Sequence, residues 1–208
     1  MASVHCLRIL AFGASLTEGF YANGCSFHPY TIRLSQLLRS LFTTVDIDNA
    51  GLSGEAVLSD TMLSRLQRLL SSAANKYDWV LILAGTNDTM RDQQEASRIF
   101  DRYKLLINEC HKHGARVLSM TLPETMCPRE SPLDTRRQEF NRLLREELIS
   151  NNNNNNNIVV LDVDQLLPHH SLSHDERRQI WDDEVHLTPQ GYDRLGQLIY
   201  DALKPYLS

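Results

Sequence analysis

The sequence has few cysteines, little net charge and no long apolar run, and each shortage excludes a class of protein. Its four cysteines are widely spaced, with no CxxC pair and no zinc-ligand spacing, so we expect free thiols in a reducing compartment: Cys6, Cys25, Cys110 and Cys127. No segment approaches the roughly 18 consecutive apolar residues of a membrane span. Residues 1–12 lack the longer apolar region and cleavage site of a secretory signal, so we expect a cytoplasmic protein.

The formal net charge of −5 and the pI near 5.9 provide no broad cationic field. Nucleic acid and anionic membranes are therefore disfavoured as principal partners, and a small-molecule substrate fits better. Three nearby histidines, His169, His170 and His174, lie beside Pro168 without an HExxH pattern. We interpret them as loop residues and expect no metal site.

Strand and helix patterns alternate along the whole chain of 208 residues, which has the 42% hydrophobic content of a folded domain. We expect strands at 7–12, 44–48, 79–84, 115–120 and 158–161, and long helices at 29–42, 55–72, 95–113, 133–149 and 189–206. This alternation predicts one α/β domain over 1–208, with helices on both faces of a parallel sheet. The asparagine run 151–157 is expected to be a surface loop extension because asparagine cannot bury apolar area.

Polar residues follow the first three expected strands, at 13–17, 49–54 and 85–88. In open α/β sheets ligands bind beyond the carboxyl ends of the strands, so these segments converge on one edge. Ser15 lies in a glycine-led turn between strand and helix, where its hydroxyl can project as a nucleophile. The alternative is that Ser15 only caps or forms the turn.

Two further residues at this edge can donate hydrogen bonds to an oxyanion. Gly54 offers a backbone N–H and Asn87 a side-chain NH₂, the donor types that stabilise a tetrahedral intermediate. Each has a structural alternative, because Gly54 can serve a turn that needs positive φ and Asn87 can cap a helix.

Near the carboxyl terminus, Asp183 and His186 precede a helix that Thr188 can cap. A carboxylate on one imidazole nitrogen fixes the tautomer and leaves the other nitrogen free to take a proton from a serine. A purely structural acid–histidine pair is the alternative.

Taken together, four blocks of the sequence resemble the SGNH, or GDSL-type, hydrolase family: 12–19, 49–55, 85–88 and 183–188. The resemblance implies a flavodoxin-like three-layer α/β/α sandwich with a central five-stranded parallel sheet, and ester hydrolysis without metal or cofactor. It assigns the nucleophile to Ser15, the base to His186, the carboxylate to Asp183 and oxyanion donors to Gly54 and Asn87. The sequence departs from the family at Ala14, where aspartate is usual, and in the asparagine run.

The expected function is that of a serine-dependent carboxylic ester hydrolase for small or short-acyl esters. Two alternatives stay open: an acyltransferase that uses the same acyl-enzyme, and a non-catalytic binding module on the same fold. An α/β-hydrolase is disfavoured because no Gly-x-Ser-x-Gly occurs. Loops 21–28 and 122–132 are expected to border the pocket, with these residues as candidate apolar walls: Phe20, Tyr21, Phe27 and Met126.

Overall fold

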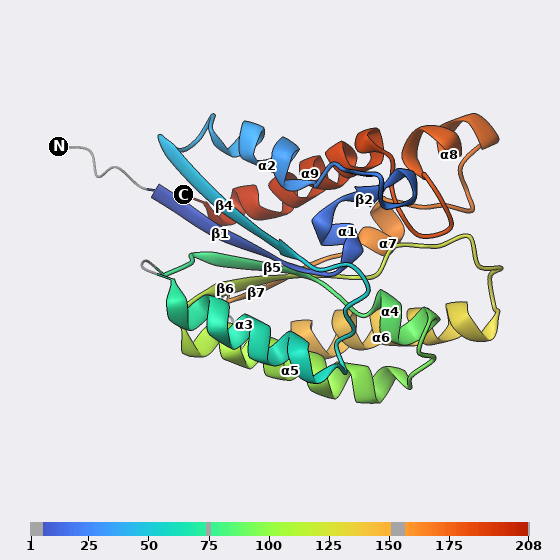
Figure 1. Cartoon of the computed structure of the whole chain (residues 1–208), viewed down its shortest axis with the longest axis horizontal. Coiled ribbons are helices and arrows are strands. Elements are labelled where there is room, and N and C mark those ends of the chain that lie inside the picture. Colours follow the sequence, from blue (N-terminus) through green and yellow to red (C-terminus); the bar gives the residue numbers. More distant parts are fainter. Residues whose placement is uncertain (1–5, 74–75, 151–156, 208) are drawn as a thin grey trace.

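Five parallel strands form the central sheet of the molecule (Figure 1). The computed structural model describes residues 6–73, 76–150 and 157–207, so all but the last residue of the asparagine run lies outside the described residues. The strands are β1 (Cys6–Gly13), β4 (Thr44–Gly51), β5 (Trp79–Leu83), β6 (Arg116–Met120) and β7 (Ile158–Leu161), in the order β4-β1-β5-β6-β7. This is the flavodoxin-like strand order, and it confirms the expected fold class.

Burial along the strands follows their place in the sheet. Every residue of the central strand β5 is buried, as its unbroken apolar run predicts for a strand covered on both faces. The edge strand β4 carries charged residues and is half-exposed. There Asp46 accepts a 2.9 Å hydrogen bond from the guanidinium of Arg8, its partner on the neighbouring strand β1. Charged side chains on an edge strand disfavour pairing with a further strand.

Helices cover both faces of the sheet and complete the three layers (Figure 1). One face carries α2 (Thr31–Leu38) and α9 (Pro189–Leu203), and the other carries α3 (Asp60–Ser72), α5 (Ala96–Lys112) and α6 (Pro132–Ser150). Helices α2 and α9 approach closely at Gly196, where a Cβ would come 2.6 Å from the carbonyl oxygen of Tyr30. Thr188 caps α9 through the N–H of Gly191, as predicted.

The predicted start of the helix at 55–72 is wrong. Helix α3 begins only at Asp60, with Ser59 as its N-cap. The N–H groups of Val57 and Leu58 donate instead to the carboxylate of Asp88, at 2.8 and 2.9 Å. Two other helices are shorter than predicted: α2 spans Thr31–Leu38, and α9 gives way at Leu203 to the 3₁₀ turn η2 (Lys204–Tyr206), which contains Pro205.

Several short elements at the carboxyl end of the sheet are additional to the predicted set. They are α1 (Ser15–Glu18), β2 (Phe20–Tyr21), η1 (Ala22–Gly24), β3 (Ser26–Phe27), α4 (Thr86–Met90), α7 (Val163–Leu166) and α8 (His174–Ile180). Figure 1 places α1, α4, α7 and α8 beyond the strand ends, on the side away from both termini. None of the helices in the described ranges combines the length and apolar character needed to cross a membrane.

Candidate active site

The turn after β1 places Ser15 at the first position of α1. The turn is tight because Gly13 lies against the end of β5, where a Cβ would overlap the carbonyl oxygen of Leu83. The carbonyl of Ala14 accepts the N–H groups of Thr17 and Glu18, both at 3.0 Å. The turn therefore forms with alanine at position 14, where the family usually has aspartate.

Three side chains form a continuous hydrogen-bonded chain at this point. The Ser15 Oγ lies 2.9 Å from Nε2 of His186, and Nδ1 of the same ring lies 2.7 Å from Oδ2 of Asp183. The other carboxylate oxygen, Oδ1, accepts the backbone N–H groups of Val185 and His186 at 2.8 and 2.7 Å. The structure thus brings together the three residues that the sequence assigned to nucleophile, base and carboxylate.

The charge state of Asp183 sets the tautomer of His186. Burial alone would raise the pKa of the Asp183 carboxyl, but the two backbone N–H groups and the imidazole outweigh burial and hold that pKa below its usual range. An ionised carboxylate only accepts hydrogen bonds, so Nδ1 carries the ring hydrogen at neutral pH. The Nε2 atom is then the acceptor that faces the Ser15 hydroxyl.

The loop that carries Asp183 and His186 is fixed on several sides. A bridge between Trp181 and Leu187 closes its base, and the Asp182 N–H donates to the carbonyl of His186 at 2.9 Å. The carbonyl of Glu184 accepts the N–H of Met126 at 2.9 Å, which ties the loop to the segment after β6. Its position therefore does not depend on helix α9 alone.

The hairpin formed by β2 and β3 covers one side of the histidine. The ring of Phe20 lies 4.5 Å, centroid to centroid, from the ring of His186. The hairpin is held there by Tyr192, whose hydroxyl donates to the carbonyl of Phe20 at 2.8 Å, and by the Ala22 N–H, which donates to Asp182 at 2.7 Å. Of the four candidate wall residues, Phe20 lies directly against the triad, Tyr21 is half-buried, and the side chains of Phe27 and Met126 are exposed.

Gly54 lies in the loop between β4 and α3, and Asn87 contacts the next residue of that loop. Asn87 lies in α4 and donates one amide hydrogen from Nδ2 to the carbonyl of Glu55 at 2.9 Å, which leaves its second amide hydrogen free for another acceptor. Gly54 has a φ of 79°, the left-handed conformation that favours glycine. Within the described ranges, the Gly54 N–H has no hydrogen-bond partner.

The loop between β4 and α3 lies close to the Ser15 turn because Gly51 has no side chain. A Cβ on Gly51 would overlap the backbone nitrogen of Glu18 in α1. The neighbouring Asn49 bridges the two segments, because its Nδ2 donates to the carbonyl of Thr17 at 2.8 Å and its Oδ1 accepts the N–H of Gly51 at 2.9 Å.

Three residues that contact this loop are absent from the sequence-based set: Glu18, Asp88 and Arg91. Asp88 is fully buried, and burial raises the pKa of its carboxyl while the N–H groups of Leu58 and Val57 oppose that shift. Nothing in the local pattern indicates that its partners lie about 30 residues earlier in the chain.

The neighbouring histidines His169 and His170 contact other groups of the protein. His169 is buried with its ring 5.2 Å from that of Trp181, and His170 Nε2 lies 2.9 Å from the carbonyl oxygen of Cys127. Burial, and then the charge of Arg177, lower the pKa of His169 to about 4. In the part of the chain that the structure describes, no three or more His, Cys, Asp or Glu side chains are grouped to hold a metal ion.

Comparison with known proteins agrees with this geometry. The profile of the GDSL-like Lipase/Acylhydrolase family matches residues 11–194. No curated protein sequence gives a significant match. Among solved structures, a lipase/acylhydrolase from Enterococcus faecalis aligns with a TM-score of 0.75 at 22% identity, covering 97% of both chains.

Two other solved structures are named for carbohydrate ester hydrolysis. The acetylxylan esterase Axe2 from Geobacillus stearothermophilus aligns with a TM-score of 0.72 at 18% identity, over 96% of this chain and 95% of its own. A carbohydrate acetylesterase family member from Sinorhizobium meliloti aligns with a TM-score of 0.73 at 16% identity, over 97% and 99%. At these identities the structures show a shared fold. By its family match, the chain belongs to the GDSL-like lipase/acylhydrolase family and is a hydrolase.

Proposed function

We propose that this protein is a serine-dependent carboxylic ester hydrolase that works through an acyl-enzyme. One observation carries the proposal: the 2.9 Å distance between Ser15 Oγ and His186 Nε2, two side chains 171 positions apart in the chain. The Asp183 carboxylate bonds the other ring nitrogen, Nδ1, and this arrangement activates a serine hydroxyl.

In the proposed reaction, His186 Nε2 takes the hydroxyl proton as the Ser15 Oγ attacks the ester carbonyl carbon. The carbonyl oxygen becomes an anion, for which we propose three donors: the backbone N–H groups of Ser15 and Gly54 and the side chain of Asn87. The ester C–O bond then breaks, and His186 gives its proton to the leaving alcohol. Water, activated by the same nitrogen, attacks the acyl-enzyme and releases the acid.

Small or short-acyl esters are the proposed substrates. A cavity of about 630 Å³ borders Gly54 and mixes apolar side chains such as Leu58 with polar ones such as Gln94. Its lining includes the proposed donor Gly54 but neither Ser15 nor His186, so it flanks the proposed oxyanion site. A long acyl chain would be better served by a predominantly apolar pocket. Because one structural neighbour is named as a carbohydrate acetylesterase family member and another as an acetylxylan esterase, acetylated saccharides belong in the first substrate panel.

The test is hydrolysis of p-nitrophenyl esters across acyl lengths, comparing the native protein with Ser15→Ala. A matched control is Ser40→Ala, because Ser40 is an exposed serine on another segment. We expect Ser15→Ala to lose hydrolysis and Ser40→Ala to keep it, with native rates falling as the acyl chain lengthens. A fully active Ser15→Ala would reject the proposal.

The acyltransferase alternative uses the same acyl-enzyme and differs only in the acceptor. Adding an alcohol or a sugar to the assay separates the two, because a transferase forms the new ester in preference to the free acid. The cytoplasmic location and the single domain over 1–208 stay predictions from the sequence.

A further inference from the structure

The loop that carries Gly54 is held by side chains from other segments. Glu18 in α1 accepts the Ser53 N–H at 2.9 Å and also bonds the Ser53 hydroxyl. On the other side, Asn87 donates to the carbonyl of Glu55. These contacts restrain the residues before and after Gly54 but leave the Gly54 carbonyl to a different partner.

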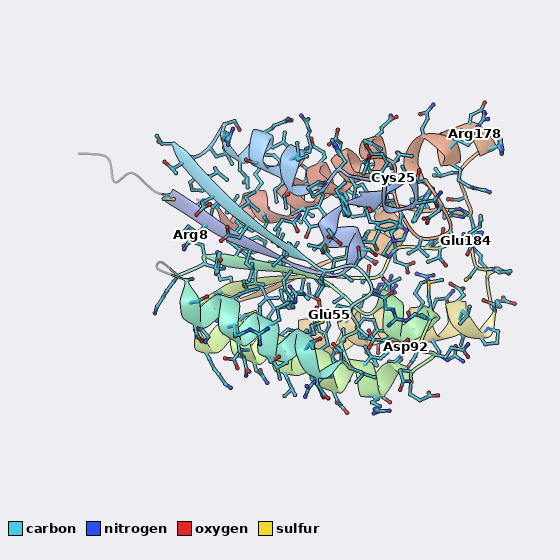
Figure 2. The ribbon with its side chains drawn as sticks, viewed as in Figure 1. Arg8, Cys25, Glu55, Asp92, Arg178 and Glu184 are labelled. Carbon is cyan, nitrogen blue, oxygen red and sulfur yellow. The ribbon has the colours of Figure 1, made fainter. Side chains whose placement is uncertain are left out.

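That partner is Arg91, the residue that follows α4. Its Nη1 donates to the carbonyl oxygen of Gly54 at 3.0 Å. Asp92 holds the rest of the guanidinium, with Nε to Oδ1 at 2.7 Å and Nη2 to Oδ2 at 3.0 Å. This two-point contact fixes the plane of the guanidinium and therefore the place of Nη1. In Figure 2, Asp92 and Glu55 lie in the half of the molecule toward the carboxyl ends of the strands, away from Arg8.

Among the described residues, Arg91 alone approaches the side of Gly54 where a Cβ would lie. Leaving out adjacent chain atoms, a Cβ built on Gly54 would meet one atom of the described residues within 4 Å, the Nη1 of Arg91 at 3.6 Å. Glycine has the least restricted backbone, so its N–H direction depends on external contacts more than that of other residues. The Gly54 N–H lies in the peptide plane before its Cα and the carbonyl in the plane after it. A hydrogen bond that fixes the carbonyl restrains ψ of Gly54 and, through the shared Cα, limits the movement of the plane that carries the N–H.

The exposure of Arg91 and Asp92 argues against a role for their ion pair in the stability of the fold. The side chain of Arg91 is 55% exposed and that of Asp92 is 32% exposed. An exposed ion pair of this kind contributes little to the free energy of unfolding. Arg91 also lines the cavity beside Gly54, so truncating its side chain opens no void in the core.

We propose that Arg91, oriented by Asp92, is a positioning residue that aims the Gly54 N–H at the ester oxyanion. This inference rests on the proposed function, because it requires Gly54 to act as a donor. Arg91 does not touch the reacting atoms in this scheme; it acts through the Gly54 carbonyl.

The test compares Arg91→Ala and Arg91→Lys with the native enzyme on a short p-nitrophenyl ester. For Arg91→Ala we expect kcat to fall about 10-fold with KM little changed, less than the roughly 10²- to 10³-fold cost of deleting a donor. Arg91→Lys should recover part of the loss, because an ammonium still donates one hydrogen bond but lacks the two-point contact with Asp92. Arg142→Ala is the matched control: Arg142 on α6 is a half-exposed arginine with a similar two-point contact, to Glu139 at 2.8 and 2.7 Å, and it does not line the cavity beside Gly54, so it should leave kcat unchanged.

A second readout separates positioning from a structural effect. Phenylboronic acid forms a tetrahedral anionic adduct with a serine nucleophile, so its Ki should rise in Arg91→Ala in step with the fall in kcat/KM, while Tm stays native. A native kcat and Ki in Arg91→Ala would overturn the inference, as would a lowered Tm with an unchanged Ki. Ser15→Ala is assayed in parallel. If it stays active, the proposed function itself fails; if it is inactive while Arg91→Ala behaves as native, only the positioning role fails.

Discussion

Replacing Asp183 with asparagine tests how the histidine is prepared for catalysis. The Oδ1 position accepts two backbone N–H groups, from Val185 and His186, so an asparagine there must keep its oxygen at that place. Its NH₂ group then occupies the Oδ2 position, 2.7 Å from the Nδ1 of His186. Two donors cannot face each other, so Nδ1 must become an acceptor and the ring hydrogen must move to Nε2. That nitrogen can then no longer take the proton from Ser15.

The expected loss follows from this wrong tautomer. We expect kcat of Asp183→Asn to fall about 10⁴-fold, equivalent to about 5.5 kcal/mol of transition-state stabilisation, with KM little changed. The assay is p-nitrophenyl acetate hydrolysis at neutral pH with circular dichroism to verify folding. Asp182→Asn is the matched control, because its side chain bonds the Ala22 N–H rather than the imidazole. A folded Asp183→Asn that kept a tenth or more of native kcat would refute the reasoning.

Three other perturbations test separate parts of the structure. Asn87→Ala should lower kcat by about 10²- to 10³-fold by removing one oxyanion donor, and steady-state kinetics with native turnover would exclude Asn87 from the site. Gly51→Ala should push α1 away from β4, because the added Cβ overlaps the Glu18 nitrogen; we expect a lower Tm and lost activity, and a native Tm would contradict the close approach. His169 has a pKa of about 4 in the folded protein and about 6.5 in the unfolded chain, so the unfolded chain binds a proton at a higher pH. The free energy of unfolding should therefore fall as the pH drops from about 6.5 toward 4, by about 2 kcal/mol at pH 5. His169→Phe keeps the ring against Trp181 and should remove that part of the pH dependence in urea unfolding at about pH 7.5 and pH 5; an unchanged dependence would contradict the assignment.

The central strands of the sheet could be predicted from the sequence because they are buried. A run such as that of β5 is apolar throughout, and in a chain of alternating strands and helices this indicates a parallel strand covered on both faces. Helix ends were less predictable. The apolar spacing continues back to Val57, but the backbone there bonds Asp88, a partner about 30 residues away that no local pattern reveals. The hairpin of β2 and β3 was missed because two-residue strands leave no periodicity to detect.

Some residues of the candidate site could be predicted from the sequence and others could not. Ser15, Asp183 and His186 were found because their residue types and motif spacing carry the chemistry, and the structure places them in hydrogen-bonding contact. Arg91 was not found, because an exposed arginine after a short helix looks like any solvated surface charge. Its significance depends on the Gly54 carbonyl, 37 positions earlier, and only the folded chain brings the two together.

The most direct measurement is to locate the covalent adduct of a fluorophosphonate probe by mass spectrometry of tryptic peptides. The peptide from Ile9 to Arg33 contains two serines, Ser15 and Ser26. We predict one probe per chain, attached to Ser15, and no labelling when His186 is replaced with alanine. Labelling of Ser26 or of a serine in another peptide, or labelling that is unchanged without His186, would contradict the assignment of Ser15 and His186 as nucleophile and base.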